Sequence, residues 1–229
     1  MSTPTTDRTL SARINLYYDL QPAPNSPAPL LIAMHGYGAF KEQMMREAQQ
    51  MAPDGFAIAS LQGFHQHMKE PRQPGGPRRY GFGWLTSYRS EESVAVHHQA
   101  VLDLIDKLAG DGVADPSRVF LLGFSQSCAL NYRFAFTYPE RLRGVVGICG
   151  GIPGDWETNT VYRQAPHLEV FHLAGTEDEF YPPSRVADYE KQLGTRAPSV
   201  ASKSYRAGHE IVPEMRSDVK QWLAQHATS

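Results

Sequence analysis

The 229-residue chain contains only two cysteines, Cys128 and Cys149. Each lies within a run of apolar residues, so we expect buried free thiols rather than a disulfide bridge, and a reducing compartment. Residues 1–10 lack the apolar run of a signal peptide, and no stretch of the chain is apolar over the length of a transmembrane helix. These absences predict a cytoplasmic protein with no membrane span.

Net charge is also small, at a formal value of -2 at pH 7, and this gives no electrostatic reason to expect nucleic acid as a partner. The chain has neither the G-x-x-x-x-G-K-[ST] nor the G-x-G-x-x-G pattern of phosphate-binding loops. His65 and His67 are two residues apart but have no accompanying cluster of cysteines or carboxylates, so contact with solvent or substrate is favoured over metal binding. We therefore expect no metal and no cofactor.

Strand-like and helix-like stretches alternate along the whole chain. Wholly apolar short runs predict buried strands, and apolar residues at helical spacing predict the helices between them. This alternation implies βαβ units and a mostly parallel central sheet flanked by helices on both faces, in a single α/β domain over residues 1–229. We predict strands at residues 9–18, 30–34, 56–61, 119–122, 144–149, 168–173 and 200–206, helices at residues 41–51, 91–109, 126–137, 184–193 and 213–225, and disorder at residues 1–6.

One strand leads directly into a serine. The apolar residues 119–122 are followed by Gly123-Phe124-Ser125-Gln126-Ser127 and then by a helical pattern. A strand that turns sharply into a helix at this point would lift the Ser125 hydroxyl above the sheet, as in a G-x-S-x-G nucleophile elbow. The alternative is an ordinary helix start, because serine is also a good N-cap residue.

Further polar groups follow other predicted strands. His35-Gly36-Tyr37-Gly38 comes after the strand at 30–34, an acidic cluster around Asp178 comes after the strand at 168–173, and His209 comes after the strand at 200–206. A serine nucleophile needs a base, and the base needs an acceptor that fixes its tautomer. Ser, Asp and His in this order, each beyond its own strand, favour a nucleophilic triad over a helix cap. Glu177 and Glu179 remain alternatives to Asp178 as the carboxylate.

With these motifs, the chain resembles the carboxylesterase/phospholipase branch of the α/β-hydrolase superfamily, which includes bacterial carboxylesterases and acyl-protein thioesterases. The resemblance extends over almost the whole chain and is most specific at Gly123-Phe124-Ser125-Gln126 and at Gly208-His209-Glu210-Ile211. It implies an α/β-hydrolase fold, with Ser125 as nucleophile, His209 as base and Asp178 as its partner. It also implies that the backbone amides of Tyr37 and Gln126 form the oxyanion hole.

The chain departs from the family pattern in two places. Ser127 stands where the elbow usually has its second glycine, and we interpret it as a tolerated small residue whose change to glycine keeps activity. Residues 62–90 replace a shorter family loop and form a long loop, predicted to lie over the carboxyl ends of the strands. In this loop Phe82, Trp84 and Tyr88 either line an acyl pocket or pin the loop to the domain.

The resemblance therefore predicts a serine esterase or thioesterase that acts through an acyl-enzyme, and the long loop, which has little continuous apolar sequence to line a deep tunnel, predicts small or medium acyl groups. The expected partner is a small-molecule ester or thioester, and we expect a monomer or a weak homodimer. Two alternatives remain open. One is a catalytically inactive member of the fold that binds a ligand, and the other is an acyltransferase or peptidase with the same triad.

Overall fold

Seven strands form the central sheet of the computed structural model, which describes residues 7–71, 73 and 75–227. The expected disorder of residues 1–6 falls outside this part of the chain. The strand order is β1-β3-β2-β6-β7-β8-β9, and every neighbouring pair is parallel except β1 and β3. The strands are β1 (Tyr18–Gln21), β2 (Ala28–Met34), β3 (Ala57–Leu61), β6 (Ala114–Phe124), β7 (Gly144–Ile148), β8 (Glu169–Gly175) and β9 (Ser199–Tyr205). This confirms the mostly parallel sheet.

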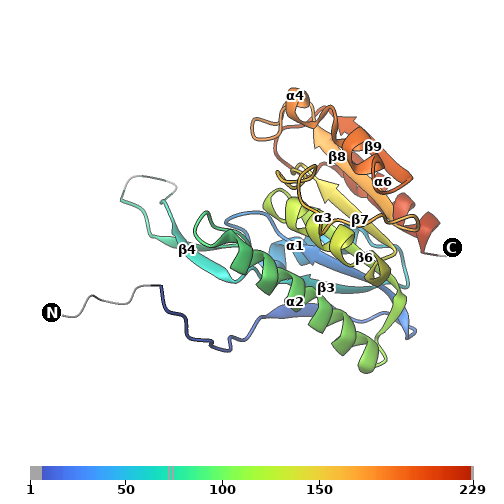
Figure 1. The fold of residues 1–229 in the computed structure, drawn as a ribbon, viewed down its shortest axis with the longest axis horizontal. Helices are drawn as coiled ribbons and strands as arrows, with labels where there is room; N and C mark the ends of the chain where they lie inside the picture. Colours follow the sequence, from blue (N-terminus) through green and yellow to red (C-terminus); the bar gives the residue numbers. More distant parts are fainter. Residues whose placement is uncertain (1–6, 72, 74, 228–229) are drawn as a thin grey trace.

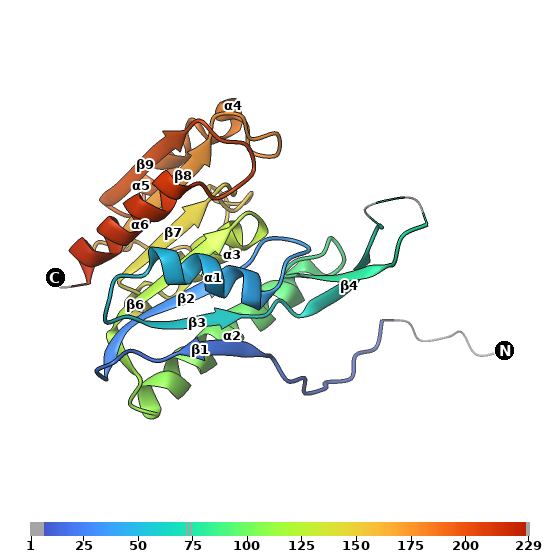
Figure 2. The same cartoon turned by 180° about the vertical axis from the view of Figure 1, so that it is seen from behind.

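Helices cover both faces of the sheet, as predicted. One face carries α1 (Lys41–Met51) and α6 (Pro213–His226), and the other carries α2 (Ser90–Gly110), α3 (Gln126–Thr137) and α5 (Tyr189–Gly194). Figure 1 looks onto the face with α2 and α3, and Figure 2 looks onto the face with α1 and α6. Two short helical turns, η1 (Pro139–Arg141) and α4 (Pro183–Val186), lie in the connections after α3 and β8.

The central strands supply side chains to both cores. Residues 30–34 of β2 have no exposed surface, because a parallel strand with helices on both sides must be apolar on both of its faces. Leu30 and Ile32 belong to the core under α2 and α3, whereas Leu31 and Ala33 belong to the core under α1 and α6. The continuous apolar run is therefore a consequence of the strand's position in the middle of the sheet.

The predicted edge strand at residues 9–18 is wrong for most of its length. Only Tyr18–Gln21 pairs with β3, and the partner of Tyr18 is Leu61, the last residue of that strand. Residues 9–16 run past the end of β3 and pair with no strand in the part of the chain that the structure describes. Leu10, which the alternating pattern placed on a buried side, is 95% exposed.

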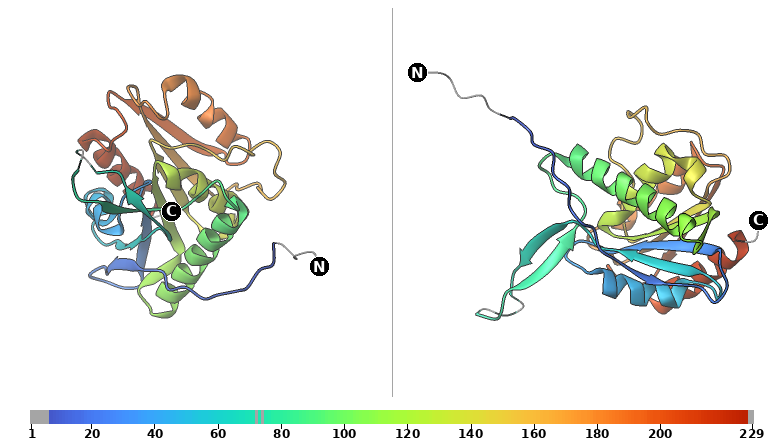
Figure 3. Two further views of the ribbon diagram at one scale, coloured as in Figure 1. Left: turned by 90° about the vertical axis from the view of Figure 1, so that its left-hand side faces the viewer. Right: turned by 90° about the horizontal axis from the view of Figure 1, so that it is seen from below.

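The segment at residues 62–90 is not a plain loop. It contains the antiparallel pair β4 (His65–Lys69) and β5 (Arg79–Gly83), which forms a separate two-stranded ribbon. The ribbon projects from the body of the molecule (Figure 3). Its strands escape sequence reasoning because β4 (His-Gln-His-Met-Lys) has only one apolar residue and β5 (Arg-Tyr-Gly-Phe-Gly) contains two glycines, so neither shows the apolar alternation of a strand packed on a core. The predicted helix at residues 184–193 is likewise two short helices, α4 and α5, separated at Ala187 and Asp188.

Within the described residues, no helix combines the length and the apolar character needed to cross a membrane. Both cysteines are buried and free, which confirms that prediction.

Phe120 tests the core that α1 and α6 form with the sheet. Its ring has no exposed surface and lies between Phe56 and Trp222, with ring centroids at 5.8 and 6.1 Å. Phe120→Ala is expected to lower the free energy of unfolding by about 3–5 kcal/mol, because it leaves a cavity that the rigid sheet cannot close. Leu10→Ala, at the exposed position where a strand was predicted, should change it by less than about 0.5 kcal/mol. Urea unfolding of both variants measures the two values, and equal losses would contradict this assignment.

Candidate active site

Ser125 occupies a strained turn between β6 and α3. Its backbone has φ 58° and ψ -115°, a conformation that residues other than glycine rarely adopt. The turn is held from β7, because the Ser125 amide donates to the carbonyl of Ile148 at 2.9 Å. Gly36 lies directly against it, since a Cβ at this position would be 3.1 Å from Cβ of Ser125. The strand-to-helix turn expected for a nucleophile elbow is therefore present at this serine.

His209 and Asp178 complete a hydrogen-bonded chain that begins at this serine. Oγ of Ser125 lies 2.9 Å from Nε2 of His209, and Nδ1 of His209 lies 2.9 Å from Oδ2 of Asp178. A carboxylate at Nδ1 keeps the proton there and leaves Nε2 free to accept the serine proton. The three residues follow β6, β8 and β9 and meet at the carboxyl edge of the sheet.

Of the three acids that follow β8, Asp178 is the one that contacts His209. Its side chain is buried, whereas Glu177 and Glu179 are exposed and Glu177 pairs with Arg206. The second oxygen of Asp178 accepts hydrogen bonds from the amides of Phe180 and Tyr181 at 2.9 and 3.0 Å. Burial alone would raise the pKa of Asp178, but the hydrogen bonds from His209 and from these two amides outweigh it and lower the pKa.

Aromatic rings surround the His209 imidazole, and sequence reasoning missed them. Phe124, Phe180 and Tyr181 have ring centroids 5.0, 4.8 and 5.9 Å from that of His209. Phe180 and Tyr181 lie two and three residues after Asp178. This short spacing was the sequence signal that could have placed them beside His209. The rings limit the rotation of the imidazole and shield its hydrogen bond to the carboxylate from water.

The loop after β2 carries the first amide expected to bind an oxyanion. His35 braces this loop, because its Nδ1 donates to the carbonyl of Gly36 at 2.8 Å while its Nε2 accepts from the amide of Gly63 at 2.9 Å. Burial lowers the pKa of His35 to about 4, so the ring is neutral at pH 7. Among the hydrogen bonds between described residues, neither the Tyr37 amide nor the Gln126 amide has an acceptor. Both are available to a ligand at Ser125.

Ser127 has a defined role in the elbow and is not just a tolerated small residue. Its hydroxyl, which is fully buried, donates to the carbonyl of Met34 at 2.9 Å and accepts from the amide of Phe124 at 3.0 Å. It therefore ties the end of β2 to the turn that presents Ser125. Gly123 also fits this turn closely, since a Cβ there would be 2.8 Å from Nδ2 of Asn131.

The three aromatic residues predicted for the pocket do not come together around Ser125. Trp84 has no exposed surface, and its ring nitrogen donates to the carbonyl of His35 at 2.8 Å. Phe82, which lies in the ribbon, packs against Phe40 at the start of α1. Tyr88 is exposed beside Arg89. Trp84 pins the segment to the domain, which is the alternative that the sequence left open.

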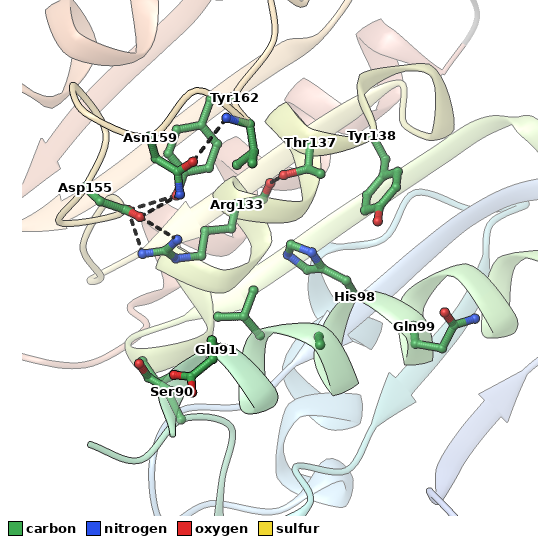
Figure 4. A pocket seen from close by; sticks show the side chains of 14 residues that line it. Ser90, Glu91, His98, Gln99, Arg133, Thr137, Tyr138, Asp155, Asn159 and Tyr162 are labelled. Carbon is green, nitrogen blue, oxygen red and sulfur yellow. Dashed lines mark hydrogen bonds and ion pairs between the residues drawn. The ribbon is translucent and has the colours of Figure 1, made fainter. Parts of the chain in front are cut away.

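Two hollows lie near the edge of the sheet that carries the triad. The one beside His209 has a volume of about 350 Å³ and is lined by Phe124, His209, Ile211 and part of α1. A larger one, of about 610 Å³, lies between α2, α3 and residues 155–162 and contains none of the three triad residues. Figure 4 shows that Arg133 in this larger hollow is paired with Asp155, which Asn159 also contacts. Arg133, Asp155 and Asn159 therefore satisfy one another in this hollow.

Comparison with known proteins finds a family model and several curated relatives that this chain resembles. The phospholipase/carboxylesterase family model matches residues 19–227. A putative esterase, NocK of Nocardia uniformis, is 28% identical over 59% of this chain and 38% of its own length. An acyl-protein thioesterase 1 of Eremothecium gossypii is 29% identical over 61% of this chain and 63% of its own length. The chain thus matches less than two thirds of the length of these curated relatives.

Solved structures agree on the fold. The carboxylesterase of Bacillus cereus superimposes with a TM-score of 0.72 at 19% identity, covering 92% of this chain and 94% of its own. The carboxylesterase of Mesorhizobium loti gives a TM-score of 0.71 at 20% identity, covering 91% and 94%. At this level of identity the likeness establishes the fold, and it confirms the predicted α/β-hydrolase fold.

Ser127→Ala tests the hydroxyl at the elbow. It leaves the buried Met34 carbonyl and the Phe124 amide without their partner, so we expect the free energy of unfolding to fall by about 1–3 kcal/mol. Ser87→Ala, at an exposed serine, should leave it unchanged. Urea unfolding measures the free energy of unfolding of both variants. An unchanged value for Ser127→Ala would mean that the hydroxyl does not stabilise the elbow.

Asp178→Asn tests the charge at the end of the triad. The pKa of Asp178 in the folded protein lies below the ordinary value of 3.8, so its ionised form stabilises the fold above that value. This stability is lost as the pH falls through the folded pKa. We therefore expect Asp178→Asn to be less stable than wild type at pH 7, with a difference that shrinks as the pH is lowered below 3.8. Chemical denaturation at several pH values checks this, with the exposed Asp54→Asn as control; a difference independent of pH would contradict it.

Proposed function

Since the chain belongs to the phospholipase/carboxylesterase family, we propose that it is a serine hydrolase that cleaves carboxylic esters, or thioesters, of small or medium acyl groups. The observation that carries this proposal is the continuous hydrogen-bonded chain from Ser125 through His209 to Asp178, with 2.9 Å at both steps. A serine hydroxyl is a poor nucleophile at neutral pH, and a base within hydrogen-bond distance is what activates it. The hydrogen bonds that link Ser125, His209 and Asp178 therefore support covalent catalysis.

The first half of the reaction forms an acyl-enzyme. His209 removes the proton of Ser125 as its Oγ attacks the acyl carbonyl, and the Asp178 carboxylate stabilises the imidazolium that results. The amides of Tyr37 and Gln126 donate to the developing oxyanion. Loss of one such donor typically costs on the order of 3 kcal/mol of transition-state stabilisation, so these amides contribute substantially to the rate. His209 then protonates the leaving alcohol or thiol.

The second half of the reaction releases the acid. His209 removes a proton from a water molecule, the resulting hydroxide attacks the acyl-enzyme carbonyl, and the same two amides hold the second oxyanion. Collapse of this intermediate breaks the bond to Ser125, whose Oγ takes its proton back from His209.

The small volume of the hollow whose lining includes His209, but not Ser125, supports small and medium acyl groups. The hollow beside His209, at about 350 Å³, lies at the small end of the range seen for ligand pockets. Among the described residues of the segment at 62–90, Trp84 is buried and the inward face of β4 is His65, His67 and Lys69, so these residues add no long apolar surface to the hollow.

Ser125→Ala should abolish turnover of p-nitrophenyl esters, because it removes the atom that forms the acyl-enzyme. The rate is expected to fall by at least about 10³-fold, with the free energy of unfolding nearly unchanged. A fluorophosphonate probe should label wild type at Ser125 and leave the variant unlabelled, with the exposed Ser87→Ala as control. Equal rates for wild type and Ser125→Ala, or no labelling of wild type, would favour an inactive ligand-binding protein of the same fold.

The same assay, run as a panel, separates the remaining reactions. We expect acetyl and butyryl esters to turn over with higher kcat/KM than palmitoyl esters, and amides to turn over slowest. A preference for palmitoyl esters would contradict the proposed acyl size. Faster cleavage of amides than esters would indicate a peptidase, and product formation that depends on an added alcohol would indicate an acyltransferase.

A further inference from the structure

We propose that the β4–β5 ribbon is the positioning element of the oxyanion hole and that Lys69 is its main positioning residue. This inference rests on the proposed function, because it concerns the amides that would bind the oxyanion. It assigns a task to the long segment at residues 62–90, which contributes no residue to the triad itself.

The inward face of β4 contacts helix α2 and the loop after β2 that carries the Tyr37 amide. Residues two apart in a strand point to the same side, so His65, His67 and Lys69 share this face. Nε2 of His65 lies 2.8 Å from Oγ of Ser93 in α2 and fixes the base of the ribbon. Next along the strand, the His67 ring stacks on Tyr37, with centroids 4.3 Å apart and an interplanar angle of 7°. Further out, Nζ of Lys69 donates to the carbonyl of Gly38 at 2.9 Å.

Lys69 and β5 hold Gly38 from both of its backbone groups. The amide of Gly38 donates to the carbonyl of Phe82 in β5 at 2.7 Å, and its carbonyl accepts from Lys69. Ala39 continues this contact as an antiparallel bridge to Phe82. Among the ion pairs between described residues, none involves Lys69. No carboxylate therefore competes there with the Gly38 carbonyl for its ammonium group. A hydrogen bond from a charged donor is stronger and shorter than a neutral one, and it fixes the loop one residue beyond the Tyr37 amide.

Glycines in β5 let the oxyanion loop lie directly on the ribbon. Gly83 and Gly81 pair with His65 and His67 across the ribbon. A Cβ on Gly81 would come within 2.8 Å of both Cα of Gly38 and Cδ of Lys69, and a Cβ on Gly83 would be 3.1 Å from the Tyr37 ring. On its inward face, the ribbon therefore contacts residues 37–39 through side chains of β4 and through the glycine backbone of β5.

The exit from β5 holds the second oxyanion residue. The Trp84 amide donates to Oε1 of Gln126 at 2.8 Å, and Nε2 of Gln126 donates to the carbonyl of Leu85 at 3.0 Å. The same inserted segment therefore contacts both residues whose amides would bind the oxyanion, although these residues come from different loops of the domain. Because oxyanion stabilisation depends on the exact placement of the donors, an element that holds both of them sets the rate of the chemical step.

Lys69→Met tests this inference. We expect kcat for p-nitrophenyl butyrate to fall on the order of tenfold with little change in KM, because a displaced donor weakens the transition state more than the ground state. Affinity for a trifluoromethyl ketone, whose hemiketal oxygen mimics the oxyanion, should fall by the same factor. Lys69→Arg keeps a charged donor and should restore most of the rate. Lys220→Met, at an exposed lysine of α6, is the matched control and should behave as wild type.

Gly81→Ala tests the glycine contact of β5 independently of the lysine. The added methyl group meets backbone of the oxyanion loop, so kcat and ketone affinity should again fall together, whereas Gly110→Ala, where a methyl group meets nothing within 4 Å, should leave both unchanged. Urea unfolding of each variant separates a displaced loop from an unfolded protein.

The outcomes distinguish this inference from the proposed function. Wild-type turnover that depends on Ser125, together with kcat of Lys69→Met and Gly81→Ala within twofold of wild type, would overturn the positioning role and leave the function standing. An increase in KM with unchanged kcat would also overturn it, because that pattern indicates substrate binding instead. Absence of Ser125-dependent turnover in wild type would overturn both.

Discussion

The left-handed backbone at Ser125 is the constraint on which the rest of the site depends. A serine at φ 58° is strained, and it persists only because its surroundings hold it on several sides. The Ile148 carbonyl accepts its amide, the Ser127 hydroxyl ties the turn to the Met34 carbonyl, and Gly36 leaves room for its Cβ. Three neighbouring strands of the sheet thus share the strain, and the buried apolar residues of those strands make the sheet stiff enough to hold it.

Burial sorts the histidines of this chain into different chemical roles. His97 and His172 lie in the core, where desolvation lowers their pKa values to about 3 and about 4, and they are neutral groups with no proton to exchange at pH 7. His35 is also neutral and acts as a brace for its loop. His209 alone has both a buried carboxylate on one nitrogen and a serine hydroxyl on the other. Its role follows from these two partners and not from its residue type.

Sequence patterns identified the sheet, most helices and the three residues that meet at Ser125, because each of these depends on local order along the chain. Apolar runs identify buried strands, and Ser, Asp and His each follow one of them. These sequence patterns gave wrong predictions where contacts with distant parts of the chain determine the local structure. Residues 9–16 alternate like a strand but have no described strand to pair with, whereas β4 pairs without any apolar alternation. For Trp84 the sequence left both a pocket and an anchoring role open, and only the tertiary contact of its ring nitrogen with the His35 carbonyl distinguishes them.

The two faces of the β4–β5 ribbon differ in how free they are to change. The inward face contacts the domain through the backbone of β5 and through alternate side chains of β4, whereas Gln66, Met68 and Tyr80 point away from it and are exposed. For protein engineering, this makes the outward face a place to graft new recognition groups. Such a graft leaves the sheet, the elbow and the contacts that hold the oxyanion loop untouched.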